Sequence, residues 1–226
     1  MMSQRSIYAF ISSLAISLGF ALTASGQSKI FTVEKDSVPF FNGLSLSVDL
    51  AGPAMLALSD YGEYEAALRV NLHDQYFPVF ELGYGKANHD DEVTGISYKT
   101  AAPYFRIGCD LNLLKKKHTK NRLYGGIRYA FTSYKADIAR PGLQDPVWQW
   151  DAPVDLRGEQ CSQHWLEAVF GVDAQVWGPL HLGWNVRYKR RIAHKDSSAG
   201  NTWYIPGYGV YSDTRIGANF IVIIDI

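Results

Sequence analysis

Charged side chains recur at alternate positions in segments that otherwise carry apolar residues, and they are the first candidates for chemistry in this sequence. The set contains both signs: Asp49, Glu65, Arg69, Glu81, Arg106, Asp110, Arg128, Glu167, Asp173, Arg187, Asp213 and Arg215. Charged groups removed from water must pair to be tolerated, so the set predicts a connected network of ion pairs in an enclosed interior. The functional alternative for the same residues is a narrow path for ions or protons, or a gate.

Two groups of Ser, His and acidic residues could support acyl transfer, in which a base activates a nucleophile. Ser162 and His164 are two residues apart in an extended segment and therefore share a face. His194, Asp196 and Ser197 lie in a polar loop, where such residues are ordinary. Neither spacing is specific for catalysis. We therefore predict a protein that is not an enzyme, with a lipid-modifying enzyme as an alternative.

The composition gives little support to metal, cofactor or nucleic-acid binding. The histidines are scattered without ligand spacing, although His89 beside the acidic run 90–92 could attract a cation loosely. The chain has 22 basic and 22 acidic residues, which indicates no nucleic-acid partner. Cys109 lies on an apolar stripe and Cys161 follows a polar loop, so we expect no disulfide between them. We predict no cofactor and no metal.

Two polar segments are candidates for binding. The segment from Lys135 to Gln160 holds Trp148 and Trp150 among several prolines, which predicts a binding surface or a loop folded over the mouth of the protein. The basic run from Lys115 to Lys120 could touch anionic lipid head groups or cell wall, although a solvated turn is the ordinary interpretation.

Period-two alternation is the pattern that positions all these residues, because successive side chains of a strand point to opposite faces. Eight segments place apolar residues on one face and charged or small residues on the other: Gly43–Ala51, Glu63–Leu72, Phe80–Gly85, Tyr104–Leu113, Leu123–Tyr134, Leu166–Val176, Leu180–Lys189 and Asp213–Ile224. Short connections alternate with longer ones at 52–62, 87–99, 135–160 and 192–204. This asymmetry is typical of barrels in the outer membrane, where turns face the periplasm and loops face outside.

The apolar face is almost free of charge in every segment, as contact with lipid requires. Aromatic residues near segment ends predict interfacial girdles: Phe40, Phe41, Tyr64, Phe77, Tyr104, Tyr124, Tyr134, Trp165, Trp177 and Tyr188. A soluble lipocalin-like binding barrel has the reverse polarity and remains an alternative.

The first 26 residues have the features of a signal peptide. Arg5 supplies the positive region, 7–23 is apolar or small, and Ala24-Ser25-Gly26 offers a cleavage site. Beyond it the chain carries 21 basic and 22 acidic residues and no apolar run long enough to span a bilayer as a helix. Export is therefore expected, with a periplasmic segment at 27–38 and a barrel at 39–226.

Several motifs resemble those of small outer-membrane barrels of the OmpA and OmpX architecture, and more closely a Bacteroidetes outer-membrane barrel family, the domain-of-unknown-function family numbered 6048. They are Phe41-Asn42-Gly43-Leu44, Val48-Asp49-Leu50-Ala51-Gly52-Pro53, Tyr61-Gly62-Glu63-Tyr64-Glu65, Pro78-Val79-Phe80-Glu81-Leu82-Gly83-Tyr84-Gly85 and Pro103-Tyr104-Phe105-Arg106-Ile107-Gly108. The resemblance implies a fold and a Gram-negative outer-membrane location, with no catalytic residues to carry over. It also implies barrel-assembly machinery as a partner, although such barrels commonly end in an aromatic residue and this chain ends in Ile226.

The sequence therefore predicts an all-β, eight-stranded, antiparallel, up-and-down transmembrane β-barrel with a structural or surface-interaction role and a closed, charge-filled interior. Closure satisfies every backbone polar group in lipid. The expected partners are outer-membrane lipids, the assembly machinery and an extracellular ligand bound through the long loops. A narrow channel, a lipid-modifying enzyme and a soluble binding barrel are the alternatives.

Overall fold

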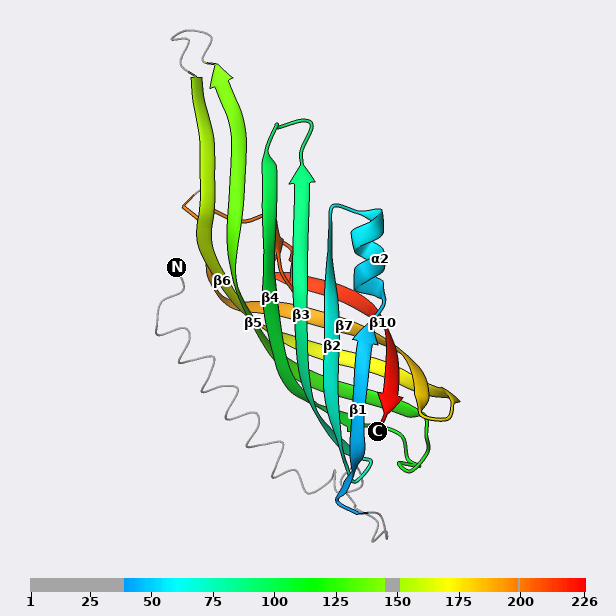
Figure 1. The fold of residues 1–226 in the computed structure, drawn as a ribbon. Coiled ribbons are helices and arrows are strands. Elements are labelled where there is room, and N and C mark those ends of the chain that lie inside the picture. The colour runs from blue at the N-terminus through cyan, green and yellow to red at the C-terminus, as the bar shows by residue number, and fades with distance from the viewer. Residues whose placement is uncertain (1–38, 145–150, 199) are drawn as a thin grey trace, which may run out of the picture. The chain divides into compact units, whose positions relative to one another are not determined.

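A computed structural model describes residues 39–144, 151–198 and 200–226, and in it Pro39–Ile226 form one compact unit. The proposed signal peptide, the segment 27–38, Trp148 and Trp150 lie outside the described residues. The unit is a closed antiparallel barrel in the order β1-β10-β7-β6-β5-β4-β3-β2 (Figure 1). Its strands are β1 Phe41–Asp49, β2 Tyr61–Leu72, β3 Tyr76–Asp90, β4 Ser97–Asn112, β5 Arg122–Gln144, β6 Asp151–Trp177, β7 Leu180–Lys195 and β10 Thr214–Asp225. The predicted eight-stranded antiparallel barrel is confirmed.

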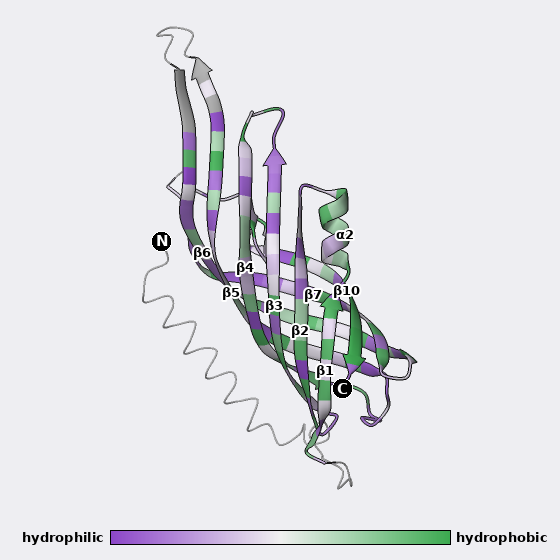
Figure 2. Cartoon of the chain, in the orientation of Figure 1, coloured by the Kyte–Doolittle hydropathy of each residue, from purple (hydrophilic) through white to green (hydrophobic). Residues whose placement is uncertain are grey.

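Hydrophilic and hydrophobic residues alternate along the strands (Figure 2), and their burial assigns them to two different faces of one wall. On β4, Phe105 and Ile107 are exposed to the outside, whereas Arg106 between them is 3% exposed. Each strand of the wall pairs with its two neighbours, and the pairing of β1 with β10 closes the ring. The barrel therefore has apolar side chains outside and charged side chains inside.

The two ends of the barrel differ. At the turn end, defined by the connections 73–75, 113–121 and 178–179, the backbones of Leu44 and Ile226 exchange hydrogen bonds of 3.3 and 2.7 Å. At the loop end, which carries the connections 50–60 and 91–96 and the segment between β7 and β10, the strands β3–β6 extend beyond the rest of the wall (Figure 1).

Three predicted loops contain regular structure. The connection from Gly52 to Gly62 holds the helix α2, Ala51–Leu58. The segments 87–99 and 135–160 are mostly strand, because β3, β4, β5 and β6 continue their pairing, as in Asp90 with Ser97 and Ala136 with Glu159. The prediction of a loop over 135–160 was wrong at 135–144 and 151–160, which belong to β5 and β6; on β5 the inward alternation continues at Ala136 and Ile138.

The last connection folds into the mouth of the barrel. Within it, β8 (Tyr204–Ile205) and β9 (Gly209–Val210) form a small hairpin. Tyr204, Ile205 and Tyr208 are each 1% exposed and pack with Tyr104 and Trp165 from the wall. We call residues 204–210 the plug hairpin. It fills the loop end of the interior. The sequence had offered the segment Lys135–Gln160 for that place.

Among the described residues no helix combines the length and the apolar character needed to cross a membrane. Both cysteines are free thiols; Cys109 is exposed on β4 and Cys161 is buried on β6.

Candidate functional site

The middle of the barrel is filled by a network of ion pairs centred on Arg106. Its Nη1 group contacts Glu65 and lies 3.3 Å from Glu81 Oε2, while its Nε is 2.9 Å from Glu167 Oε1. The remaining amino group, Nη2, donates a hydrogen bond of 2.7 Å to the carbonyl oxygen of Gly207 in the plug hairpin. Arg106 therefore joins three carboxylates of the wall to the plug.

Arg187 and Arg128 extend this network around the barrel. Arg187 reaches Glu65 at 2.8 Å and Glu81 at 2.7 Å through its two terminal nitrogens. Arg128 donates to Glu81 at 2.9 Å and holds both oxygens of Asp110 at 2.6 and 3.0 Å. The fork of a guanidinium suits such bidentate contacts, which fix geometry as well as charge.

Towards the turn end, Arg69 continues the chain of contacts. Its Nη1 is 2.6 Å from Asp173 and its Nη2 is 3.6 Å from Asp110, and its guanidinium lies over the ring of Tyr124. Beyond it, Asp225 accepts hydrogen bonds from Arg122 at 2.9 Å and from Ser45 at 2.7 Å. Charges of both signs thus line the interior from the plug to the turn end.

Most of the residues predicted for the interior are brought together there, but Asp49, Asp213 and Arg215 are not in the network. Asp49 is buried, yet its carboxylate accepts the backbone N–H groups of Ala51 at 3.3 Å and Gly52 at 2.8 Å at the start of α2. Asp213 lies outside and pairs with Arg191, with a side chain that is 86% exposed. Its placement inside was wrong because β10 begins at Thr214, so strand alternation does not extend to Asp213.

Arg215 faces inward at the loop end, where its Nη1 donates a bond of 3.2 Å to the carbonyl oxygen of Val210. It therefore holds the plug hairpin and does not pair with a carboxylate of the network. Its partner belongs to a segment that no pattern in the sequence places inside.

The predicted set lacked three groups that complete the site. Lys189 is buried and donates to the carbonyl oxygen of Gly207 at 2.7 Å. Tyr104 donates its hydroxyl to Glu65 at 2.8 Å, and the indole N–H of Trp165 donates to Glu167 at 2.6 Å. Alternation could have found them, because each lies two residues from an inward charge.

The aromatic girdles also need correction. Tyr64, Trp177 and Tyr188 are exposed on the outside, as are Phe40 and Phe41. The other five predicted girdle residues are at most 5% exposed and point into the barrel: Phe77, Tyr104, Tyr124, Tyr134 and Trp165. Their rings fill the interior above and below the charged layer, since an aromatic residue at a strand end can face either side.

The predicted nucleophile and base pairs do not meet in a catalytic geometry. Ser162 and His164 face outward on β6, and His164 Nδ1 is hydrogen-bonded to Tyr129 Oη at 2.7 Å. In the second group, His194 lies 3.2 Å from Asp196, whereas the Ser197 hydroxyl donates to the carbonyl oxygen of Gly200 at 2.8 Å. In neither group does the hydroxyl engage the imidazole.

The basic turn is anchored to its neighbours rather than freely solvated along its length. Lys117 donates to Gln75 at 2.8 Å, and His118 lies 2.8 Å from Asp74. Burial raises the pKa of the Asp74 carboxyl, but hydrogen bonds from His118, Asn71 and Asn42 outweigh it and hold the pKa below its ordinary value. At the loop end, His89 pairs with Asp60 at 2.7 Å and stacks on Trp203.

The fold and the interior define a closed eight-stranded barrel with inverted polarity. The family model described as a domain of unknown function, DUF6048, matches residues 6–225, so the chain belongs to that family, as its motifs had indicated. No curated protein matches the chain. A solved structure of Ail, the attachment invasion locus protein of Yersinia pestis, in complex with the heparin analogue sucrose octasulfate, is similar at a TM-score of 0.40 with 9% identity, over 81% of this chain and 98% of that chain.

Proposed function

We propose that this protein is a small outer-membrane β-barrel with a structural or surface-interaction role, whose turn end faces the periplasm and whose loop end faces outside. The observation that carries the proposal is the inverted polarity of the wall. Leu46, Phe80, Ile107, Phe170 and Val186 are each about half exposed on five different strands, whereas the charges lie inside. Apolar side chains around the whole circumference are stable only in contact with lipid.

The height of this apolar surface suits a bilayer. On β4 and the residue that follows it, the outward residues from Pro103 to Leu113 are apolar. Ten residue steps of a strand rise about 33 Å, and a barrel tilt of about 40° reduces this to roughly the 25 Å band of outer-membrane barrels. Tyr64, Tyr84 and Tyr188 are exposed near the loop end of the band, where an interfacial girdle is expected.

The interior supports a closed barrel rather than a channel. Arg106, Arg128 and Arg187 each bridge at least two carboxylates, and the plug hairpin occupies the loop end. An ion path would require these pairs to separate and the hairpin to leave. The outward position of Ser162 and His164 likewise favours a role other than catalysis.

Contact surfaces are then provided by the lipid-facing wall and by the protruding strands. The expected partners are outer-membrane lipids, the assembly machinery that inserts barrels, and an extracellular ligand at the loop end. The loops and extended hairpins are where outward contacts form, because the barrel itself is buried in the membrane.

The test is made on the full chain expressed in a Gram-negative host. We expect it to fractionate with the outer membrane and to migrate faster on a denaturing gel unboiled than boiled, because a closed barrel resists detergent. In a planar bilayer we expect no steady conductance. A soluble protein with heat-insensitive migration would overturn the proposal in favour of a soluble binding barrel, and steady single-channel currents would replace the closed interior with a channel.

A further inference from the structure

The outer faces of β3, β4 and β5 carry three lysines just beyond the apolar surface: Lys86 and Lys135 are both level with Ala101, and Lys99 is two residues further towards the loop end. Lys86, Lys99 and Lys135 line one surface pocket of about 450 Å³, and all three are exposed. Adjacent strands lie about 4.8 Å apart, so the three ammonium groups can converge on one ligand. None of them has a hydrogen bond or ion pair to a described residue.

The acidic residue in this pocket is already engaged. Asp137 is the cross-strand neighbour of Lys99, and its Oδ1 accepts the backbone N–H of Gly158 at 2.7 Å. The lysine pocket, defined as Lys86, Lys99 and Lys135, has three ammonium groups against the one carboxylate of Asp137 and so keeps an excess of positive charge.

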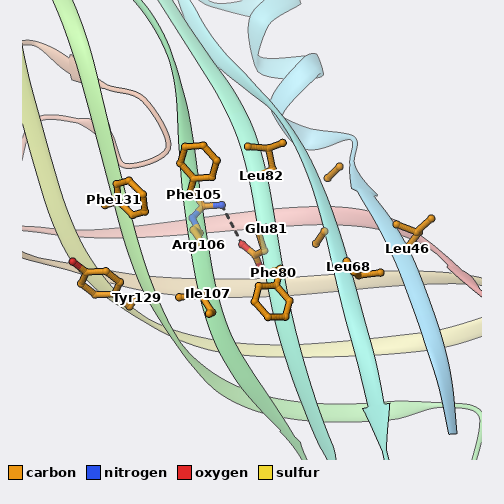
Figure 3. Close-up of a pocket in the computed structure, with 12 residues that line it drawn as sticks. Leu46, Leu68, Phe80, Glu81, Leu82, Phe105, Arg106, Ile107, Tyr129 and Phe131 are labelled. Carbon is orange, nitrogen blue, oxygen red and sulfur yellow. Dashed lines mark hydrogen bonds and ion pairs between the residues drawn. The ribbon is translucent and has the colours of Figure 1, made fainter. Parts of the chain in front are cut away.

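The outer faces of β1–β5 carry an apolar groove on the turn-end side of the lysines. Its volume is about 550 Å³, and its lining includes Ala66 together with Leu82, Phe105 and Phe131, which are labelled in Figure 3. Phe105 and Phe131 stack with ring centroids 5.3 Å apart. The small side chain of Ala66 leaves room between larger neighbours, so the outer wall is hollowed where a chain-like apolar molecule could lie.

The groove and the lysine pocket are aligned along the strands. Leu82 and Lys86 are four residues apart on one face of β3, and Phe131 and Lys135 are four apart on one face of β5. Four residues of a strand span about 13 Å. An amphiphile with its acyl chains in the groove would place its head group at the lysines.

We propose that this surface of β2–β5 binds a phosphate-bearing lipid of the outer leaflet, with acyl chains in the groove and phosphate at the lysine pocket. The inference rests on the proposed function, because it requires the loop end to face outside. It adds the class of lipid that binds to this part of the wall. Phosphate fits because it is anionic and accepts several hydrogen bonds, and each ammonium group offers three donors. A neutral lipid would leave the lysines without a partner.

The test measures binding of diphosphoryl lipid A to the full chain, purified from membranes in neutral detergent, by native mass spectrometry. Replacing Lys86, Lys99 and Lys135 together by Gln is expected to weaken binding about a hundredfold at low salt, because each lysine near an anionic lipid contributes roughly a fivefold factor. The matched control is the replacement of Arg157, Arg190 and Lys195 by Gln, three exposed cations on β6 and β7, which should leave affinity unchanged.

A second variant tests the groove with the lysines intact. Ala66→Phe fills the groove and is expected to weaken lipid A binding about tenfold, whereas Ala174→Phe on the outer face of β6 should not. Removing both phosphates from the lipid should abolish the difference between wild type and the triple lysine variant, and inorganic phosphate should compete only weakly.

Equal affinity of the wild type, both triple variants and Ala66→Phe would overturn the inference. Gel migration of the same samples separates this failure from failure of the proposed function. If the unboiled protein still migrates fast and fractionates with the outer membrane, the barrel stands and only the lipid site is lost. If the wild type does neither, the proposed function itself fails.

Discussion

The inner and outer faces of strands β3–β5 carry cations in opposite situations. Inside, Arg106 and Arg128 each contact more than one carboxylate and are at most 3% exposed. Outside, Lys86, Lys99 and Lys135 are exposed and pair with no described residue. The difference teaches that charge on this barrel has two uses: paired arginines hold the wall together, and unpaired lysines remain available to a ligand.

The residue types agree with these uses. A guanidinium has a planar fork that satisfies two carboxylates at once, and it stays charged when buried. An ammonium group is a compact point charge on a flexible stem and suits a hydrated, adaptable contact. Lys189 is the exception inside, and its donors go to carbonyl oxygens of the plug hairpin at Gly207 and Tyr208.

The largest expected effect comes from removing a paired cation. In Arg106→Met, Glu65, Glu81 and Glu167 lose one of the two guanidinium groups that they share, and only Arg187 still contacts all three. Breaking a buried pair costs about 3–5 kcal/mol, and we expect the free energy of unfolding to fall by that amount in urea titrations of the refolded barrel in vesicles. Lys99→Met outside should change it by less than about 0.5 kcal/mol. Equal effects of the two variants would erase the distinction between the faces.

A smaller loss is expected when the charge is kept and the fork is removed. Arg187 donates to Glu65, Glu81 and Asn185 with three different nitrogens. Arg187→Lys should lower the free energy of unfolding by about 1–3 kcal/mol, because one ammonium group cannot reach all three acceptors. Lys135→Arg is the converse change outside and should preserve both stability and lipid A binding. Wild-type stability of Arg187→Lys would mean that charge alone holds the network.

A substitution at Gly207 is expected to weaken the packing of the plug hairpin against the wall. This residue has φ +80°, and an added Cβ would lie 2.4 Å from Cγ of Tyr104. Gly207→Ala is therefore expected to cost about 1–3 kcal/mol through backbone strain and the clash, and to produce brief current openings in planar bilayers. Gly158 has φ +68° with nothing within 4 Å, so Gly158→Ala measures the strain alone. Identical behaviour of both variants would show that the hairpin does not depend on the close contact.

The sequence predicts which side of the wall a residue faces only within segments where apolar and polar residues alternate. The phase of β3, β4 and β5 places Glu81, Arg106 and Arg128 inside, as the structure has them. The same phase predicts that Tyr104 lies inside, two residues before Arg106, whereas its place near a strand end favours a girdle; the structure follows the phase. Aromatic residues are therefore better assigned by the nearest charged residue on their own strand.

The remaining features depend on contacts between distant segments. The plug hairpin has strands of two residues each, too short for a periodic signal, and it is held by Arg106 and Lys189 from other strands. Asp213 is one residue outside β10, where alternation stops. The partners within the network follow from barrel closure and register, which no local pattern encodes.

The smallest expected effect lies at the turn end, where Asp74 is intermediate between the enclosed network and the exposed lysines. Its carboxylate is bonded by Asn42 at 2.8 Å, Asn71 at 2.7 Å and His118 at 2.8 Å. Because these bonds lower its pKa below the ordinary value of 3.8 despite burial, the charged form stabilises the fold above that value. This stabilisation is lost as the pH falls through the lower pKa of the folded state.

Asp74→Asn should therefore reduce the free energy of unfolding by up to about 1 kcal/mol at pH 7, as expected for a partly exposed pair. The deficit should shrink once the pH falls below the ordinary carboxyl pKa of 3.8. Urea titrations of wild type and variant at neutral and acid pH measure it, with the exposed Asp90→Asn as the control. A deficit of the same size at every pH would assign the role of Asp74 to packing of the turn, and would leave charge pairing as a property of the barrel interior alone.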